Sequence, residues 1–124
     1  MSDFRDFLNV DDVKKLVTTS VNYKNEDTDK ARTLLLFRTS TQQTWLIATS
    51  LRLYCALDDR RKPNATIQWS MPIAEARTAT ISEREYRDRT GLLDIGKRTN
   101  WLYTKGLFER TDVIEAVRNL VRQE

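Results

Sequence analysis

Apolar and polar side chains alternate most regularly over residues 43–59, QTWLIATSLRLYCALDD. This period of two predicts two antiparallel strands that reverse tightly at Thr49-Ser50. In the first strand, Trp45 and Ile47 share one face. One face of the second strand is apolar and carries Leu51, Leu53, Cys55 and Leu57. The opposite face carries Arg52, Tyr54 and Asp58, so the pattern is typical of a half-buried strand.

Five other segments fit short strands: residues 34–37, 66–71, 77–82, 92–95 and 100–104. Pro72 should end the 66–71 strand because it has no N–H to donate. Residues 58–64, DDRRKPN, are expected to form a charged loop, and residues 83–90, EREYRDRT, a charge-dense loop or turn. Seven short strands without a long helix between them predict a mostly antiparallel barrel or sandwich.

A helical period appears at both ends of the chain. Near the C-terminus, an apolar stripe within residues 111–122 consists of Val113, Ile114, Val117, Leu120 and Val121. It predicts an amphipathic helix, which Asp112 and Glu115 would cap at its start. Near the N-terminus, two short helices are expected over residues 2–8 and 11–19, followed by a polar loop over 22–30. The sequence therefore divides into an N-terminal helical segment, residues 1–30, and a main domain, residues 31–124.

Seven strands followed by one C-terminal helix is the element order of the pleckstrin-homology (PH) superfold. Three local patterns resemble bacterial PH and GRAM domains: the hairpin TSLRLY (49–54), the strand and turn WSMPIAEA (69–76), and the closing segment 100–108 before the helix. The resemblance covers residues 31–124. It implies a bent seven-stranded antiparallel barrel, with the C-terminal helix plugging one open end and loops at the other end forming the binding surface. Many PH domains bind phosphoinositides through basic residues in the first hairpin, whereas the turn here, STQQ (40–43), has none.

Composition excludes several kinds of catalytic site. The 124 residues contain no histidine, one cysteine and three glycines. A serine–histidine or cysteine–histidine pair, the usual zinc ligand sets, a P-loop and a dinucleotide fingerprint are all absent. The sequence therefore predicts a protein that is not an enzyme and needs no cofactor or metal. Cys55 lies on an apolar strand face and is expected to be a small buried hydrophobic residue.

Two charged segments are the candidate binding sites. The first is the loop that contains Arg60, Arg61 and Lys62. The second is the EREYRDRT segment, where the aromatic ring of Tyr86 is flanked by Arg84, Arg87 and Arg89. Guanidinium groups can bind phosphate or carboxylate in a bidentate manner, although the three acidic residues of this segment reduce its net charge to zero.

The first functional hypothesis is a non-catalytic module that binds a protein partner through these loops. Binding of anionic lipid or phosphoinositide headgroups is an alternative, because the chain carries a net charge of +3. A third hypothesis is nucleic-acid binding, in which Trp45, Trp69 or Trp101 would stack on bases instead of packing in the core. The N-terminal helices could dock on their own domain or pair with a second copy. No signal peptide or long apolar segment is apparent, so a cytoplasmic location is expected, with peripheral membrane association as an option.

Overall fold

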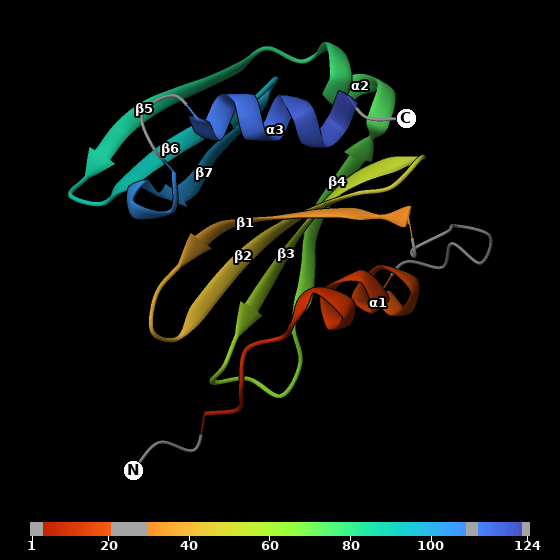
Figure 1. Cartoon of the computed structure of the whole chain (residues 1–124), viewed down its shortest axis with the longest axis vertical. Coiled ribbons are helices and arrows are strands. Elements are labelled where there is room, and N and C mark those ends of the chain that lie inside the picture. The colour runs from red at the N-terminus through yellow and green to blue at the C-terminus, as the bar shows by residue number, and fades with distance from the viewer. Residues whose placement is uncertain (1–3, 21–29, 109–111, 123–124) are drawn as a thin grey trace.

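The computed structural model of the chain describes residues 4–20, 30–108 and 112–122 (Figure 1). Its helices are α1 (Val10–Ser20), α2 (Ile73–Thr78), the short 3₁₀ helix η2 (Lys105–Leu107) and α3 (Asp112–Arg122). Its strands are β1 (Arg32–Arg38), β2 (Gln42–Ala48), β3 (Arg52–Asp59), β4 (Thr66–Pro72), β5 (Ile81–Arg87), β6 (Thr90–Ile95) and β7 (Arg98–Thr104). The fold is mainly β, and the seven strands and the C-terminal helix agree with the sequence-based prediction.

The strands form two separate antiparallel sheets. Sheet A has the order β1-β2-β3-β4, and sheet B has the order β5-β6-β7. The prediction of one continuous barrel is therefore wrong, because within the described chain no ladder of hydrogen bonds closes the sheets into a ring. Strands β1 and β7 approach each other at one corner, where the Arg38 backbone N–H donates to Thr104 Oγ1 at 2.9 Å.

The predicted hairpin at the centre of the sequence is confirmed as β2 and β3. Their register pairs Gln42 with Asp59 at one end and Ala48 with Leu53 at the other. Thr49 shapes the reversal, since its Oγ1 accepts hydrogen bonds from the backbone N–H groups of residues 51 and 52 at 3.2 and 3.0 Å. Leu51 lies in this loop and is 54% exposed. Its expected place on the apolar strand face is therefore wrong.

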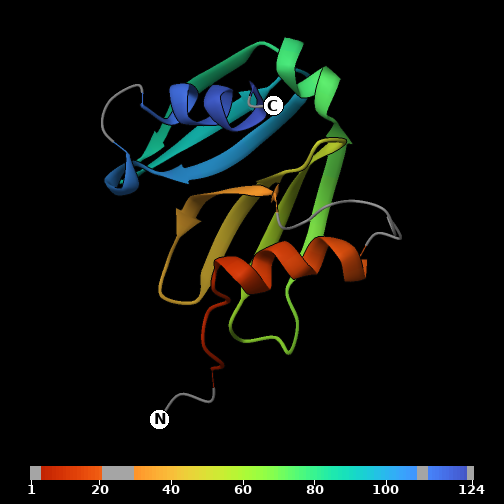
Figure 2. The same ribbon diagram turned by 45° about the vertical axis from the view of Figure 1, so that its right-hand side comes forward.

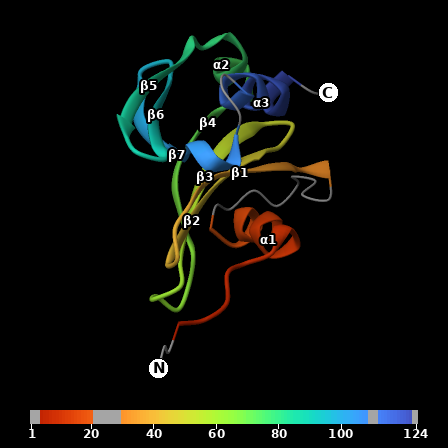
Figure 3. The same ribbon diagram turned by 60° about the vertical axis from the view of Figure 1, so that its left-hand side comes forward.

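Sheet A is covered on both faces. One face contributes to the main core, which it shares with sheet B, α2 and α3. The other face carries Trp45, Ile47 and Tyr54 and packs against Val13 and Val17 of α1. Figure 3 shows sheet A close to edge-on, with α1 on one side of it. The expectation of a half-buried β3 is wrong, because α1 covers the face that the alternating pattern predicted to be exposed to solvent.

The amphipathic helix α3 is confirmed and joins the two sheets. It contacts β1 of sheet A and β5 of sheet B, and it also packs on α2 (Figure 2). Its four buried residues are Val113, Val117, Leu120 and Val121. Arg32 of β1 donates from Nε and Nη2 to the Leu120 carbonyl at 3.0 and 2.8 Å, which satisfies an acceptor in the last turn of the helix.

Residues 77–82 do not form the single strand predicted for them. Residues 77–78 belong to α2, and only residues 81–82 belong to β5. Pro72 ends β4, and the good helix formers of AEAR follow directly. Ile73 and Ala76 are three residues apart, and both become buried when this short helix packs on the core.

Residues 83–90 are not the predicted loop, because β5 continues to Arg87. The strand pairs with β6 and reverses at residues 88–89. Two of its charged side chains pair with residues that follow later in the chain: Arg84 pairs with Asp94 of β6 at 3.0 Å, and Glu85 pairs with Lys105, just after β7, at 3.4 Å. A strand at the edge of a sheet tolerates such a composition, so the sequence pattern concealed it.

The first of the two predicted N-terminal helices is also absent over its described part. Residues 4–9 have no helical structure and run along the loop between β3 and β4, whereas the second helix is confirmed as α1. Arg5 explains the difference, because its backbone N–H donates to the Arg60 carbonyl at 3.2 Å. The segment is held by the loop it crosses. The polar loop predicted over residues 22–30 lies outside the described residues, apart from Lys30.

Gly91 is required by close packing inside sheet B. A Cβ atom at this position would overlap the ring of Tyr103, which lies opposite it on β7. The Tyr103 hydroxyl donates a hydrogen bond to Glu83, and burial together with this carboxylate raises the pKa of Tyr103 to about 12. The absence of a side chain at Gly91 therefore allows the ring to reach its acceptor.

We expect Gly91→Ala to lower the free energy of unfolding by about 1–3 kcal/mol, because the Tyr103 ring must move and lose its hydrogen bond. Urea denaturation measures this change. Gly106→Ala is the matched control, since no atom lies within 4 Å of a Cβ there, and it should change stability by less than about 0.5 kcal/mol. Equal effects at the two positions would contradict the close packing of Tyr103 on Gly91.

Candidate functional site

The loop between β3 and β4 contains the first predicted basic site, and Arg60 is fully engaged within the protein. Its Nε donates to the Arg5 carbonyl at 2.6 Å, and its Nη1 donates to the Ser40 carbonyl at 3.1 Å. The guanidinium also lies 5.7 Å from the ring centroid of Phe4 and 5.0 Å from that of Phe7. Arg60 thus holds the N-terminal segment on the loop, and cation–π contacts add to its hydrogen bonds.

Arg61 forms a bidentate ion pair with Asp59. The Nε and Nη2 atoms donate to the two carboxylate oxygens at 2.9 and 2.7 Å, and the Arg61 backbone N–H donates to Oδ1 at 3.0 Å. These hydrogen bonds hold the pKa of Asp59 well below its usual range and raise the pKa of Arg61. The Lys62 side chain is exposed. A lipid headgroup would therefore meet one lysine here and would compete with Asp59 for Arg61.

The N-terminal segment completes this arrangement through Arg5 and Asp58. Asp58 is 1% exposed, and Arg5 Nη2 lies 2.5 Å from its Oδ1. The Leu8 backbone N–H donates to Oδ2 of Asp58 at 2.8 Å. Arg5 donates further hydrogen bonds to the backbone carbonyls of Asp59 and Lys62. We therefore assign a structural role to this charged cluster: it attaches residues 4–9 to the end of sheet A.

The second predicted site lies on the hairpin formed by β5 and β6, and its residues differ in their surroundings. Arg84 makes two hydrogen bonds to Asp94, at 3.0 and 3.2 Å, in the middle of the hairpin. The remaining residues lie at the reversal, which we call the hairpin tip: Tyr86, Arg87, Asp88 and Arg89. The two predicted basic sites lie far apart in all three ribbon views and do not form one surface (Figures 1, 2 and 3).

The hairpin tip presents an aromatic ring and two guanidinium groups to solvent. Tyr86 is 48% exposed, and the Arg87 guanidinium lies 4.8 Å from the centroid of its ring. Arg89 has a φ of 65°, in the left-handed region that usually favours glycine. An arginine at this position costs backbone energy, and such strain is concentrated at functional sites.

The tryptophans do not form an exposed platform for stacking bases. Trp45 is 8% exposed and packs beneath α1. Trp69 and Trp101 contact each other across the two sheets, with ring centroids 4.7 Å apart and ring planes tilted by 40°. The three tryptophans therefore serve packing.

Cys55 is fully buried, and burial raises the pKa of its thiol to about 12, so it is an unreactive core residue.

A third basic surface, which the sequence did not predict, lies at the junction of α2, β5 and α3. It is a pocket of about 110 Å³, which we call the arginine pocket, and its lining residues are Ala76, Arg77, Ala79, Ile81, Arg118, Val121 and Arg122. The Nε of Arg77 donates to the Val121 carbonyl at 2.7 Å. The four-residue spacing of Arg118 and Arg122 places them on one side of α3, but the sequence pattern predicts a strand at Arg77. No sequence signal therefore connected the three arginines.

Among the described residues, no group of three or more cysteine, aspartate and glutamate side chains could hold a metal ion. Over the same residues, no helix is both long and apolar enough to cross a membrane. Comparison of the chain with protein-family models, curated proteins and solved structures finds no significant match. The functional assignment therefore rests on the geometry of the two surfaces described above, the hairpin tip and the pocket.

Proposed function

We propose that this chain is a non-catalytic binding module with a PH-like arrangement of two sheets, and that it binds a protein partner through the hairpin tip. The architecture is supported by the division into four and three antiparallel strands, together with a C-terminal helix that contacts both sheets. The binding function is supported by the composition of the tip. Tyrosine and arginine are the residue types that most often dominate binding energy at protein interfaces.

The left-handed conformation of Arg89 is the single observation that carries this proposal. Glycine would adopt the same φ without the steric cost of a side chain. Arg89 adds a second exposed cation to the tip, where the Arg87 guanidinium already contacts the Tyr86 ring, at the end of the β5–β6 hairpin of sheet B (Figure 1). A tip selected only for stability would not need this arginine, whereas a tip that pairs with acidic groups of a partner would use it.

The proposal predicts that Arg89→Gly stabilises the protein and weakens partner binding. Relief of the left-handed strain should raise the free energy of unfolding by about 0.5–1 kcal/mol, which corresponds to a rise in Tm of about 2–5 °C. Thermal denaturation measures the first effect. Affinity capture from an extract of the native cell, quantified against the unaltered chain, measures the second.

Tyr86→Ser in the same capture should reduce recovery of the partner at least about tenfold, and Arg89→Gly should reduce it several-fold. Lys62→Ala is the control, because it removes an exposed basic side chain at the distant loop. Its capture profile should match that of the unaltered chain. Profiles that are unchanged in both tip variants would contradict the proposal. Equal loss of binding in Arg89→Gly and Lys62→Ala, with Tyr86→Ser unchanged, would indicate dependence on net charge and would also contradict the proposal.

A further inference from the structure

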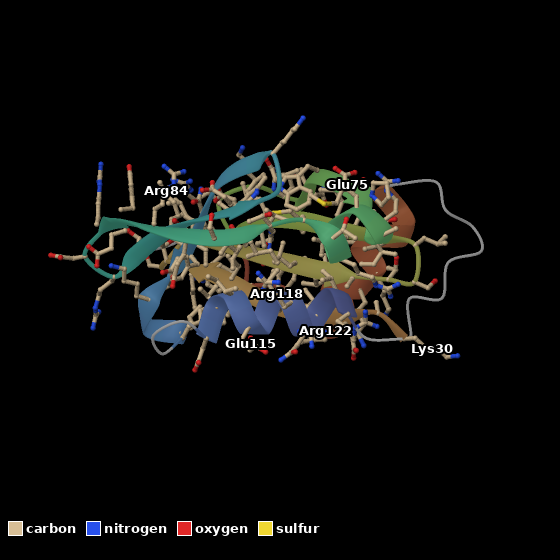
Figure 4. All side chains as sticks on the ribbon, turned by 90° about the horizontal axis from the view of Figure 1, so that it is seen from above. Lys30, Glu75, Arg84, Glu115, Arg118 and Arg122 are labelled. Carbon is tan, nitrogen blue, oxygen red and sulfur yellow. The ribbon has the colours of Figure 1, made fainter. Side chains whose placement is uncertain are left out.

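The arginine pocket has the features of an anion-binding site. Arg77, Arg118 and Arg122 reach it from two different helices, α2 and α3. No carboxylate of a described residue lines it. Figure 4 shows Arg118 and Arg122 on neighbouring turns of α3, while Glu75 lies on the side of α2 turned away from that helix. The Glu75 carboxylate therefore does not neutralise the positive charge of the arginine pocket.

One arginine of this pocket is fixed by the protein before any ligand arrives. Arg77 donates from Nε to the Val121 carbonyl, which positions its guanidinium at the end of α3. Behind it, Arg32 binds the Leu120 carbonyl, and the pKa of Arg32 is lowered by burial and by the positive charge of Arg77. Repulsion between these cations would be relieved by an anion in front of them. An anion bound here would therefore lower the repulsion between the arginines, and Arg77 would not have to change its conformation to bind it.

The floor of the pocket restricts the kind of anion. Ala76, Ala79, Ile81 and Val121 offer apolar contacts, so the ligand should have an aliphatic part as well as a negative charge. A glutamate side chain combines both properties, because its two methylene groups can lie on the apolar floor while its carboxylate meets the arginines.

We propose that the arginine pocket binds a glutamate side chain from an acidic segment of a protein partner. The methylene groups would lie on the apolar floor, and the carboxylate would pair with Arg118 and Arg122, which are exposed and can donate in a bidentate manner. This inference rests on the proposed function, because it assumes a protein partner, but it concerns a surface separate from the hairpin tip. It identifies the chemistry that the partner must supply.

The test is an NMR titration of the full, ¹⁵N-labelled chain with the peptide acetyl-Gly-Glu-Glu-Glu-Gly-amide at low salt. Saturable shifts should centre on the backbone amides of Ala76, Ala79, Ile81 and Val121. The matched peptide with glutamine in place of glutamate should produce no saturable shift. Inorganic phosphate is the third probe, and tighter saturable binding of phosphate than of the glutamate peptide at these amides would overturn the assignment to a carboxylate.

Two variants with equal loss of charge make the result specific. R118Q/R122Q should weaken peptide binding at least about tenfold, whereas K15Q/K62Q, which changes one lysine on α1 and one on the β3–β4 loop, should leave it within about twofold. Both alter exposed side chains, and spectra without peptide report whether each remains folded. Equal weakening by both variants would overturn the pocket, since net charge alone would then control binding.

The two proposals fail in different ways. Loss of partner capture in the hairpin-tip variants together with absent peptide shifts would support the proposed function and rule out glutamate binding at the arginine pocket. Specific peptide shifts together with unchanged capture by the hairpin-tip variants would remove the tip as the binding surface and retain the pocket.

Discussion

Val117→Asp should unfold the protein or lower its free energy of unfolding by at least about 4 kcal/mol. Val117 is fully buried in the core shared by α3 and both sheets, so an aspartate there would place an unpaired charge among apolar side chains. A domain of this size is stable by only about 5–15 kcal/mol, and the loss is therefore a large part of the total. Circular dichroism and urea denaturation measure it.

Asn119→Asp is the matched control for this prediction. It introduces the same side chain two residues away, at an exposed position of the same helix. Its effect should be below about 0.5 kcal/mol. A Val117→Asp protein with the wild-type melting temperature would show that α3 does not cover the core, and the architecture described here would be wrong.

Arg5→Ala should have the second largest effect, a loss of about 3 kcal/mol. The substitution removes the ion-pair partner of the buried Asp58 carboxylate and three hydrogen bonds that Arg5 donates to backbone carbonyls. Breaking a buried ion pair from one side is costly because the remaining charge loses its compensation. Chemical denaturation measures the loss, and proteolysis should cleave the N-terminal segment faster in the variant.

Arg84→Ala separates the effect of burial from the simple loss of an ion pair. Arg84 also pairs with an aspartate, Asp94, but its side chain is 53% exposed, against 24% for Arg5. Exposed pairs contribute about 0–1 kcal/mol, so this variant should remain close to wild type. If both variants lost the same stability, the cluster around Asp58 would not be the attachment of the N-terminal segment.

The parts of the fold that could be predicted are those whose pattern is local. The β2–β3 hairpin was predictable because its alternation and its Thr49 turn lie within one short segment. Helix α3 was predictable because its stripe repeats over three turns. In both elements the residues next to each other in sequence decide the structure.

The parts that could not be predicted depend on residues far apart in the chain. Strand β5 looks like a loop until Asp94 and Lys105 supply partners for its charges. The segment that contains Phe4 and Phe7 has helical spacing, yet Arg60 and Asp58 hold it without helical structure. A helix prediction from periodicity considers only neighbouring positions, and it fails where tertiary contacts decide.

The candidate sites divide in the same way. The hairpin tip could be recognised from sequence because Tyr86 and its arginines are neighbours in the chain. The arginine pocket could not be recognised, because Arg77 and Arg118 are 41 residues apart and meet only when α2 packs on α3. The arginines of the β3–β4 loop matched the composition of a binding site, but the fold uses Arg60 and Arg61 for its own contacts.

Site-specific photocrosslinking in the native cell tests the binding of a protein partner most directly. A benzoylphenylalanine residue is placed at Tyr86 in one protein and at Gln68, an exposed position on β4, in another. We expect one dominant protein adduct from position 86, none from position 68, and a weaker adduct when Arg89→Gly is added. No adduct from position 86, or the same adducts from both positions, would contradict partner binding through the hairpin tip.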